Sequence, residues 1–406
     1  MKYPETSKKE VDVTGISGAV KIGCRTDKGM IIPQAFKFRA IEGAPENVLW
    51  ADYSVSAESC FAMSDGTLYA APLCKKFVAV TEADGEPFML EEYDGGRRKT
   101  FVVSGEKYAV FDGETHSVNA FRCGIYAGVT KCGRLFGVDS EDKTLVRWTG
   151  TDGINDLKES IEGAGWMRLE GAFGNVLNLV VAGDYLVAVR EYGLTAISAF
   201  GAPENFRQIN AVHKAPRIFK NTAVAINGKL YFYTVKGLYC FDGNKIAEVF
   251  ADRRGMLNTP TYAVAYGQNY CVCGFSAALG REAVLIYETS GGAAYFADIP
   301  AKTLCAHNGL IAFTAAGAYI SEAGGEYTFE SGEINFGDAR KKTLTGIEIL
   351  GGAADVEVTN GVVSRILGGV NGFARVNLRG NHFKITLKGK EKLGAVKAFA
   401  EVGYGI

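Results

Sequence analysis

Short hydrophobic runs alternate with tight turns along most of this chain. Between residues 221 and 249 four such runs follow one another: Val224 to Ile226, Leu230 to Tyr233, Leu238 to Phe241 and Ile246 to Val249. Turns containing Asn-Gly, Lys-Gly and Asp-Gly separate them, and such turns favour the positive φ angles that short hairpins need. The pattern predicts a four-stranded antiparallel meander. Since a meander of this size cannot bury both faces alone, it should stack against copies of itself.

Copies of this unit recur from Cys60 onward. Each has a hydrophobic strand, a turn with glycine and a second hydrophobic strand, and the turn glycines are Gly66, Gly105, Gly133, Gly183, Gly228, Gly267 and Gly309. Their separations are 39, 28, 50, 45, 39 and 42 residues, close to the roughly 40–50 residues of a propeller blade. The sequence therefore predicts a β-propeller of six or seven four-stranded blades over residues 58–332. The alternative is a set of unrelated hairpins in a large sandwich.

The two ends of the chain lack this repeat. Residues 333–406 contain six further hydrophobic runs, several of them separated by Asn-Gly turns, and predict a small β-sandwich. Residues 1–57 predict strands that either close the propeller ring or join the sandwich. The expected fold class is all-β: a six- or seven-bladed β-propeller followed by a small β-sandwich.

Composition agrees with many short strands. Gly is abundant at 51 residues and Pro scarce at 9, while a net charge of −1 gives no general attraction to nucleic acid or anionic membranes. The first residues are too polar for a signal peptide, and no run of 18 apolar residues occurs, so no membrane span is expected. The nine cysteines are expected to be buried free thiols of a chain made in a reducing cytosol.

Residues with catalytic chemistry do not form a recognisable set. The four histidines lack paired spacing, so no metal or cofactor is expected. Six aspartates fall at turns, where aspartate is favoured for conformational reasons. The alternative is that some of them are the catalytic carboxylates of a glycosidase. The six are Asp112, Asp139, Asp152, Asp156, Asp184 and Asp242. We expect no catalytic residue, and hence a protein that is not an enzyme.

Three short basic clusters are candidates for contact with passing DNA or with neighbouring subunits. They are Arg97, Arg98 and Lys99; Arg253 and Arg254; and Arg340, Lys341 and Lys342. Facing a shared channel, such side chains would contact a phosphate backbone without sequence specificity. In a nearly neutral protein, the alternative is that they serve only as a solvated surface.

Three stretches of the chain resemble a known family. Gly133 to Asp139 followed by Leu145 to Trp148 looks like a blade of the β-propeller neck and tail proteins of tailed bacteriophages. Gly201 to Phe206 is similar to the Pro-Glu-Asn-aromatic turn of such blades. Ile334 to Asp338, then Leu344 to Ile347, is similar to the exit from the propeller into a C-terminal sandwich. The resemblance covers about residues 97 to 350.

The resemblance implies a structural virion protein of the packaged-DNA stabilisation, tail-hub or nozzle type. Such a protein is made in the host bacterial cytoplasm and assembles as a homo-oligomeric ring at the portal–tail junction or DNA exit channel. Its partners would be portal, adaptor or tail components. Two other classes stay open: a carbohydrate-active or carbohydrate-binding propeller, and an intracellular protein-interaction scaffold. Asp and Glu side chains converging at the central channel beside aromatic rings would favour the carbohydrate class.

Overall fold

The computed structural model describes residues 6–83, 85–94, 97–105, 107–112, 115–120, 124–151, 162–209, 213–249 and 255–403. In these ranges the regular structure consists of strands β1 to β38 and two 3₁₀ turns, η1 (Val13–Gly15) and η2 (Pro203–Asn205), which confirms the all-β prediction. No helix in the described ranges is long and apolar enough to cross a membrane. The chain forms two compact units. Unit 1 contains residues up to Lys37, Ala293–Asp298 and residues from Glu322, and unit 2 contains Phe38–Gly292 and Ile299–Ser321.

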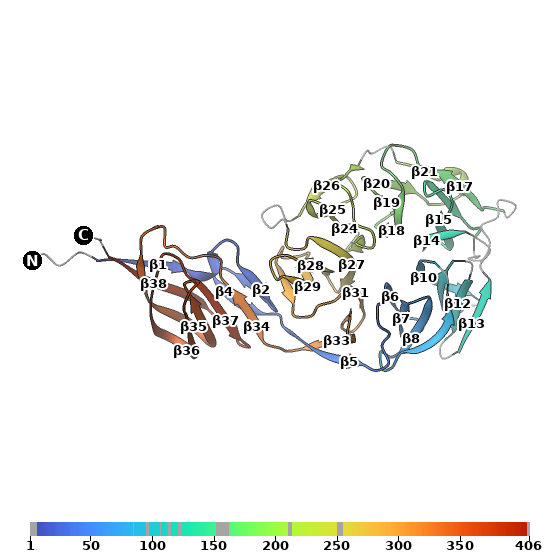
Figure 1. The fold of residues 1–406 in the computed structure, drawn as a ribbon. Helices are drawn as coiled ribbons and strands as arrows, with labels where there is room; N and C mark the ends of the chain where they lie inside the picture. The colour runs from blue at the N-terminus through green and yellow to red at the C-terminus, as the bar shows by residue number, and fades with distance from the viewer. Residues whose placement is uncertain are drawn as a thin grey trace, which may run out of the picture. The chain divides into compact units, whose positions relative to one another are not determined.

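Unit 2 consists of antiparallel meanders that follow one another along the chain (Figure 1). The first three are β6–β9 (Trp50–Ser54, Ser59–Ser64, Thr67–Pro72, Val78–Glu82), β10–β13 (Pro87–Asp94, Arg97–Ser104, Lys107–Asp112, Thr115–Ala120) and β14–β17 (Ile125–Lys131, Arg134–Asp139, Leu145–Trp148, Gly165–Arg168). The next two are β18–β21 (Val176–Ala182, Tyr185–Arg190, Gly193–Ser198, Arg207–Gln208), with β22 (His213–Lys214) pairing β20, and β23–β26 (Val224–Ile226, Lys229–Thr234, Gly237–Phe241, Ile246–Glu248). The last two are β27–β29 (Thr259–Tyr266, Asn269–Ser276, Arg281–Glu288) and β31–β33 (Thr303–Ala306, Leu310–Thr314, Gly317–Ala323).

The first strands of these meanders form a closed ring. Neighbours around it are β6, β10, β14, β18, β23, β27 and β31, and β31 contacts β6 again. Figure 1 shows the sheets arranged radially about this ring. Among the described residues, six of these seven blades are sheets of four or five strands. The remaining blade, β27–β29, lies between the blades that begin with β23 and β31. The predicted six- or seven-bladed β-propeller is therefore confirmed.

A strand from before the first blade completes the last one. β5 (Phe36–Ile41) pairs with β33, so that the sheet order is β31-β32-β33-β5. The N-terminal strands are therefore divided: β5 pairs in the last blade, while β1 (Thr6–Asp12) and β2 (Val20–Ile22) pair within unit 1. Unit 2 spans Phe38–Ser321 apart from residues 293–298, against the 58–332 assigned from the repeat.

The turn glycines explain the regularity of the blades. Six of the seven have positive φ, from 58° at Gly183 to 75° at Gly228, where residues with a Cβ are disfavoured. Gly309 is the exception, because its φ is ordinary. A Cβ on it would lie 2.7 Å from the carbonyl oxygen of Ser321, so this glycine allows a close approach of two backbones instead.

Large hydrophobic side chains fill the space between neighbouring blades. Phe61 of the first blade lies 4.5 Å from Phe111 of the second, centroid to centroid, and both are buried. Val187 of the fourth blade and Phe232 of the fifth share another buried cluster and are 0% exposed. Because each blade is covered on both faces, its strands carry nearly continuous apolar runs instead of a strict alternation.

Unit 1 combines strands from both ends of the chain. Its sheet runs in the order β1, β38 (Ala395–Gly403), β35 (Lys342–Thr359), β37 (Lys384–Gly389), β34 (Tyr327–Glu330), β2 and β30 (Ala294–Ala297), and β36 (Ser364–Gly380) also pairs with β35. A separate hairpin joins β3 (Cys24–Asp27) to β4 (Met30–Pro33). The core holds Tyr327, Phe329, Leu344 and Ile385, each 0% exposed.

The predicted small β-sandwich is not confirmed, since these strands belong to one hydrogen-bonded sheet. Four of the predicted strands join into two long ones. The runs at Thr343 to Leu350 and Asp355 to Val358 are parts of β35, and those at Val362 to Ile366 and Phe373 to Leu378 fall mainly within β36. The predicted turn at Asn371-Gly372 is an irregular point inside β36, where Gly372 has φ 87°.

Candidate functional site

The predicted basic residues lie in both units. Arg97, Arg98 and Lys99 are on β11 of the propeller, where Arg97 and Arg98 are exposed. The Arg98 guanidinium forms an ion pair of 2.8 Å with Glu91. Arg253 and Arg254 lie outside the described residues, so their predicted role is not addressed.

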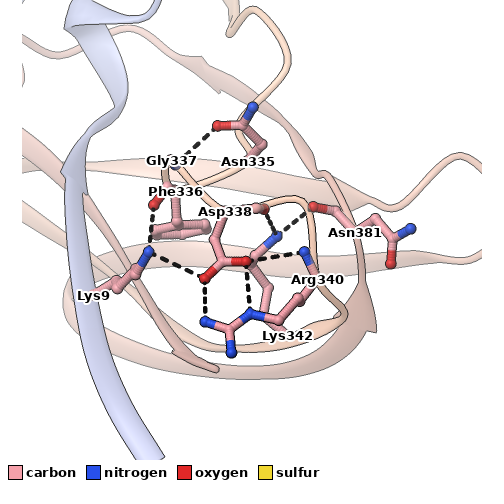
Figure 2. Close-up of polar contacts among 8 residues, drawn as sticks. All are labelled: Lys9, Asn335, Phe336, Gly337, Asp338, Arg340, Lys342 and Asn381. Atoms are coloured by element: carbon pink, nitrogen blue, oxygen red, sulfur yellow. Dashed lines mark hydrogen bonds and ion pairs between the residues drawn. The ribbon is translucent and has the colours of Figure 1, made fainter. Parts of the chain in front are cut away.

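In the third basic cluster, in unit 1, Arg340 binds the carboxylate of Asp338 (Figure 2). Arg340 donates from Nε and Nη2 to the two oxygens of Asp338, at 3.0 and 2.7 Å. Lys9 of β1 donates to Asp338 Oδ2 at 3.4 Å and to the Phe336 carbonyl at 3.2 Å. These donors hold the pKa of Asp338 well below its usual range, with the Arg340 hydrogen bond as the largest cause.

Lys342, at the start of β35, is turned into the protein. It is 1% exposed, and its Nζ donates to the carbonyls of Asp338 and Asn381, both at 2.6 Å (Figure 2). Burial lowers the pKa of its ammonium, partly offset by Asp338. In this arrangement Lys342 stabilises the fold of unit 1. Lys341 is exposed and takes no part in this network of described residues.

A polar cluster between the first and second blades was not predicted from the sequence. The carboxylate of Glu91, on β10, accepts hydrogen bonds from Ser54 Oγ at 2.6 Å and from the Ser56 backbone at 3.1 Å. Ser54 and Ser56 also contact the hydroxyl of Thr100 at 2.5 and 3.0 Å. We call Asp52, Ser54, Ser56, Glu91, Arg98 and Thr100 the Glu91 cluster.

The two carboxyls of the Glu91 cluster have pKa values shifted in opposite directions. Burial raises the pKa of Asp52 to about 6, and the charge of Glu91 adds to the effect. For Glu91, burial is the largest single influence and acts upward. The donors Ser54, Ser56 and Arg98 outweigh it together and lower its pKa. A pair of carboxyls separated in this way can supply one protonated and one ionised group at the same pH.

An aromatic side chain of another blade lies near Asp52. Tyr262, on β27, donates its hydroxyl to the carbonyl of Ala51 at 3.0 Å. Burial and the charge of Asp52 raise the pKa of this phenol well above its usual range. The signal for the cluster was present in the sequence: Asp52 and Glu91 interrupt apolar strands instead of occupying turns, where we looked for aspartates.

The histidines do not form a metal site in the described residues, where no three His, Cys, Asp or Glu side chains gather. His213 is buried against Phe241, at 4.7 Å between ring centroids, and burial lowers its pKa. His307 is exposed at a turn of the last blade and stacks on Tyr53 of the first, at 3.9 Å and 7°. The two rings line a cavity of about 270 Å³ together with Val55, Glu58, Leu73, Cys74, Asn308 and Ile320.

The residues that carry the family resemblance meet at the boundary of the third and fourth blades. Phe206, next to η2, lies 5.2 Å from Trp148 and 5.7 Å from Phe136, centroid to centroid. The Arg134 guanidinium lies 5.9 Å from the Phe206 centroid and donates to the carbonyls of Thr149 and Gly163. We call these four residues the Phe206 cluster. The Pro-Glu-Asn-Phe turn of the fourth blade therefore packs against the third blade through Phe206.

Comparisons with known proteins give a fold likeness only. No protein-family profile and no curated protein matches the chain. Among solved structures, a chain of the Saccharomyces cerevisiae complex of Dbp5 with Nup159, Gle1, IP6 and ADP is similar, at 11% identity and TM-score 0.42, covering 73% of this chain and 95% of that one. The Neurospora crassa Pan2 WD40 domain is similar at 6% identity and TM-score 0.47, covering 73% and 96%. The propeller assignment stands on the strand pairing described above.

Proposed function

We propose that this chain is a non-enzymatic structural protein of a tailed-bacteriophage particle. It is made in the host bacterial cytoplasm and acts at the portal–tail junction or DNA exit channel. The Phe206 cluster is the observation that supports the proposal. Motifs that resemble the phage propellers, about 60 residues apart in the sequence, meet as one packed unit between two blades.

In this role the propeller acts by its shape. Rigid blades present loops to portal, adaptor or tail components, and subunits associate into a ring through heterologous interfaces that close by rotation. Exposed apolar side chains suit such interfaces. Phe200 of the fourth blade is 77% exposed and Trp166 of the third is 48% exposed. The exposed side chains of Arg97, Arg98 and Lys341 would make non-specific contact with passing DNA.

The proposal is tested on particles. Mass spectrometry of purified virions should find the chain in several copies, and imaging should place it at the portal or tail. The double variant Phe200→Asp/Trp166→Asp should fold but be depleted from particles. Val118→Asp, at an exposed position of the second blade, serves as the control and should be incorporated normally. Absence of the wild-type chain from particles would overturn the proposal.

A carbohydrate-active or carbohydrate-binding propeller is the second candidate, and the Glu91 cluster favours it. Asp52 and Glu91 lie on the neighbouring inner strands β6 and β10, their pKa values differ in direction, and Tyr262 supplies an aromatic ring. An Asp and Glu pair beside an aromatic ring supports this class, because glycosidases use two carboxyls with different pKa values. A glycan panel decides it. Binding or hydrolysis by the wild type that Asp52→Asn abolishes, in a variant that still unfolds cooperatively and is no less stable than the wild type, would establish this function.

A further inference from the structure

Two buried thiols meet where the first and last blades adjoin. Cys60 lies on β7 of the first blade and Cys305 on β31 of the last, and their Sγ atoms are 3.2 Å apart although the residues are separated by 245 positions. They are 0% and 1% exposed. A disulfide requires an S–S distance of about 2.05 Å, so the two sulfurs need to approach by only about 1 Å.

We propose that Cys60 and Cys305 form a reversible disulfide that closes the propeller ring covalently when the chain meets a small-molecule disulfide as oxidant. One cysteine thiolate attacks a sulfur of the oxidant, which forms a mixed disulfide and releases one thiolate of the oxidant. The second cysteine thiolate then attacks the sulfur of the first cysteine in this mixed disulfide. This step forms the Cys60–Cys305 bond and releases the second thiolate of the oxidant. The oxidant is reduced by two electrons, and the two cysteine protons pass to its two thiolates.

A cavity lies beside the pair. Tyr53, which pairs with Cys60 across β6 and β7, and His307, two residues beyond Cys305, line the cavity of about 270 Å³. Cys74 also lines this cavity and belongs to the same buried cluster as the pair. Burial raises the pKa of Cys74 to about 12 and that of Cys305 well above its usual range. Oxidation of the folded chain therefore requires local opening and should be slow.

The position of this bond should increase the thermal stability of the propeller. The first and last blades are the two ends of the ring, which is otherwise closed here by packing and hydrogen bonding. A cross-link between residues so far apart in the sequence removes much conformational freedom from the unfolded chain. The oxidised propeller should therefore melt at a higher temperature than the reduced one. The proposal does not depend on the function proposed above.

The test compares the full chain kept in reductant with the full chain incubated with oxidised glutathione. Each sample is alkylated before denaturation and then digested. The oxidised sample should yield a linked peptide pair containing Cys60 and Cys305, and its propeller should melt about 5 °C higher or more. Reductant should reverse both results. Exposed Cys132 reports in the same digest that the oxidant and the alkylating reagent reached the folded protein.

Variants separate this bond from general oxidation. Cys60→Ala and Cys305→Ala should each abolish the difference in melting temperature between oxidised and reduced samples. Cys271→Ala removes a thiol that is equally buried on β28 and should retain the difference. Recovery of Cys60 and Cys305 as free thiols after oxidation, or linkage of either to Cys74, would overturn the proposal. The linked peptides are identified in the wild-type chain, so this test remains decisive even if a variant fails to fold.

Discussion

At the turn between β23 and β24, Asn227 and Gly228 have φ angles of 51° and 75°, and Ile226 pairs with Lys229 across them. These are the features of the type I′ turn that the Asn-Gly dipeptide predicts. A Cβ on Gly228 would meet nothing within 4 Å, so only the backbone angle opposes a side chain. We expect Gly228→Val to lower the propeller's free energy of unfolding by about 1–2 kcal/mol, as measured by urea denaturation.

Asn227→Gly is the matched control for this turn. Glycine accepts the same positive φ, so that variant should change the free energy of unfolding by less than about 0.5 kcal/mol. If Gly228→Val were as stable as the wild type, the assignment of the turn would be wrong.

Asp52 should make the propeller less stable as the pH rises. Its pKa is about 6 in the folded chain against an ordinary value of 3.8, so between these values the folded state holds a proton that the unfolded state has released. Its stabilising contribution is therefore complete below about pH 4 and is lost as the pH rises through about 6. We expect Asp52→Asn to raise the free energy of unfolding at pH 7 by about 1–2 kcal/mol and to flatten its dependence between pH 4 and 6.

Glu91→Gln should change the stability of the propeller in the opposite direction to Asp52→Asn. Because the folded-state pKa of Glu91 lies below its ordinary 4.5, its contribution is present above that pH and is lost as the pH falls. This variant should destabilise the propeller at pH 7. Equal pH profiles of the wild type and Asp52→Asn would show that Asp52 titrates normally.

Residue types alone predicted some of these positions and not others. The positive φ of the turn glycines follows from local chemistry, so Gly66, Gly133 and Gly228 could be identified in advance. Lys342 could not, because its burial depends on carbonyls of Asp338 and Asn381 that only the folded unit 1 brings together. The raised pKa of Asp52 could not be predicted either, because it arises mainly from burial in the folded propeller, with a smaller contribution from Glu91 of the neighbouring blade.

At the scale of elements, hydrophobic runs located the blade strands closely. The run predicted at Leu230 to Tyr233 lies within β24, and that at Val224 to Ile226 coincides with β23. In unit 1 the same reasoning divided long strands too often. Asn371-Gly372 reads locally as a hairpin turn, yet β36 continues through it because its pairing with β35 resumes after a shift of register. Local sequence does not contain that information.

Strand β5 offers a prediction about ring closure. A fragment of residues 38–321 retains the last four residues of β5 beside β33, whereas a fragment of residues 42–321 leaves β33 as an unpaired edge. We expect the shorter fragment to melt at a lower temperature and to aggregate more readily, because exposed strand edges pair with other chains. Thermal denaturation followed by light scattering measures both effects. Identical curves for the two fragments would mean that β5 does not hold the ring.

At the scale of the whole molecule, the N-terminal region could not be assigned from the sequence because its partners lie far along the chain. Thr6 pairs with Gly403, and Lys9 reaches Asp338. β5, only 23 residues after β1, belongs to the last blade. Repeats in the sequence reveal a propeller through the likeness of its blades. They contain nothing about which distant strands pair with the residues outside the repeat.

Each compact unit has a core of its own, so we expect two cooperative transitions in calorimetry. Phe206→Ala removes the ring that packs on Trp148 and should lower the propeller transition alone, by about 2 kcal/mol. Asp338→Asn removes the charge that Lys9 and Arg340 share and should lower the unit 1 transition alone.

Acid should reproduce the effect of Asp338→Asn in the wild type. Because the folded-state pKa of Asp338 lies below its ordinary 3.8, its contribution is present above that pH and disappears as the pH falls further. As the pH falls below about 3.8 the unit 1 transitions of the wild type and of Asp338→Asn should therefore move progressively closer together, while at pH 7 they differ by the full amount. Phe206→Ala carries no titrating group and should keep its deficit in the propeller transition at both pH values. A single transition that both substitutions move would show that the chain unfolds as one cooperative body, in contradiction to this expectation.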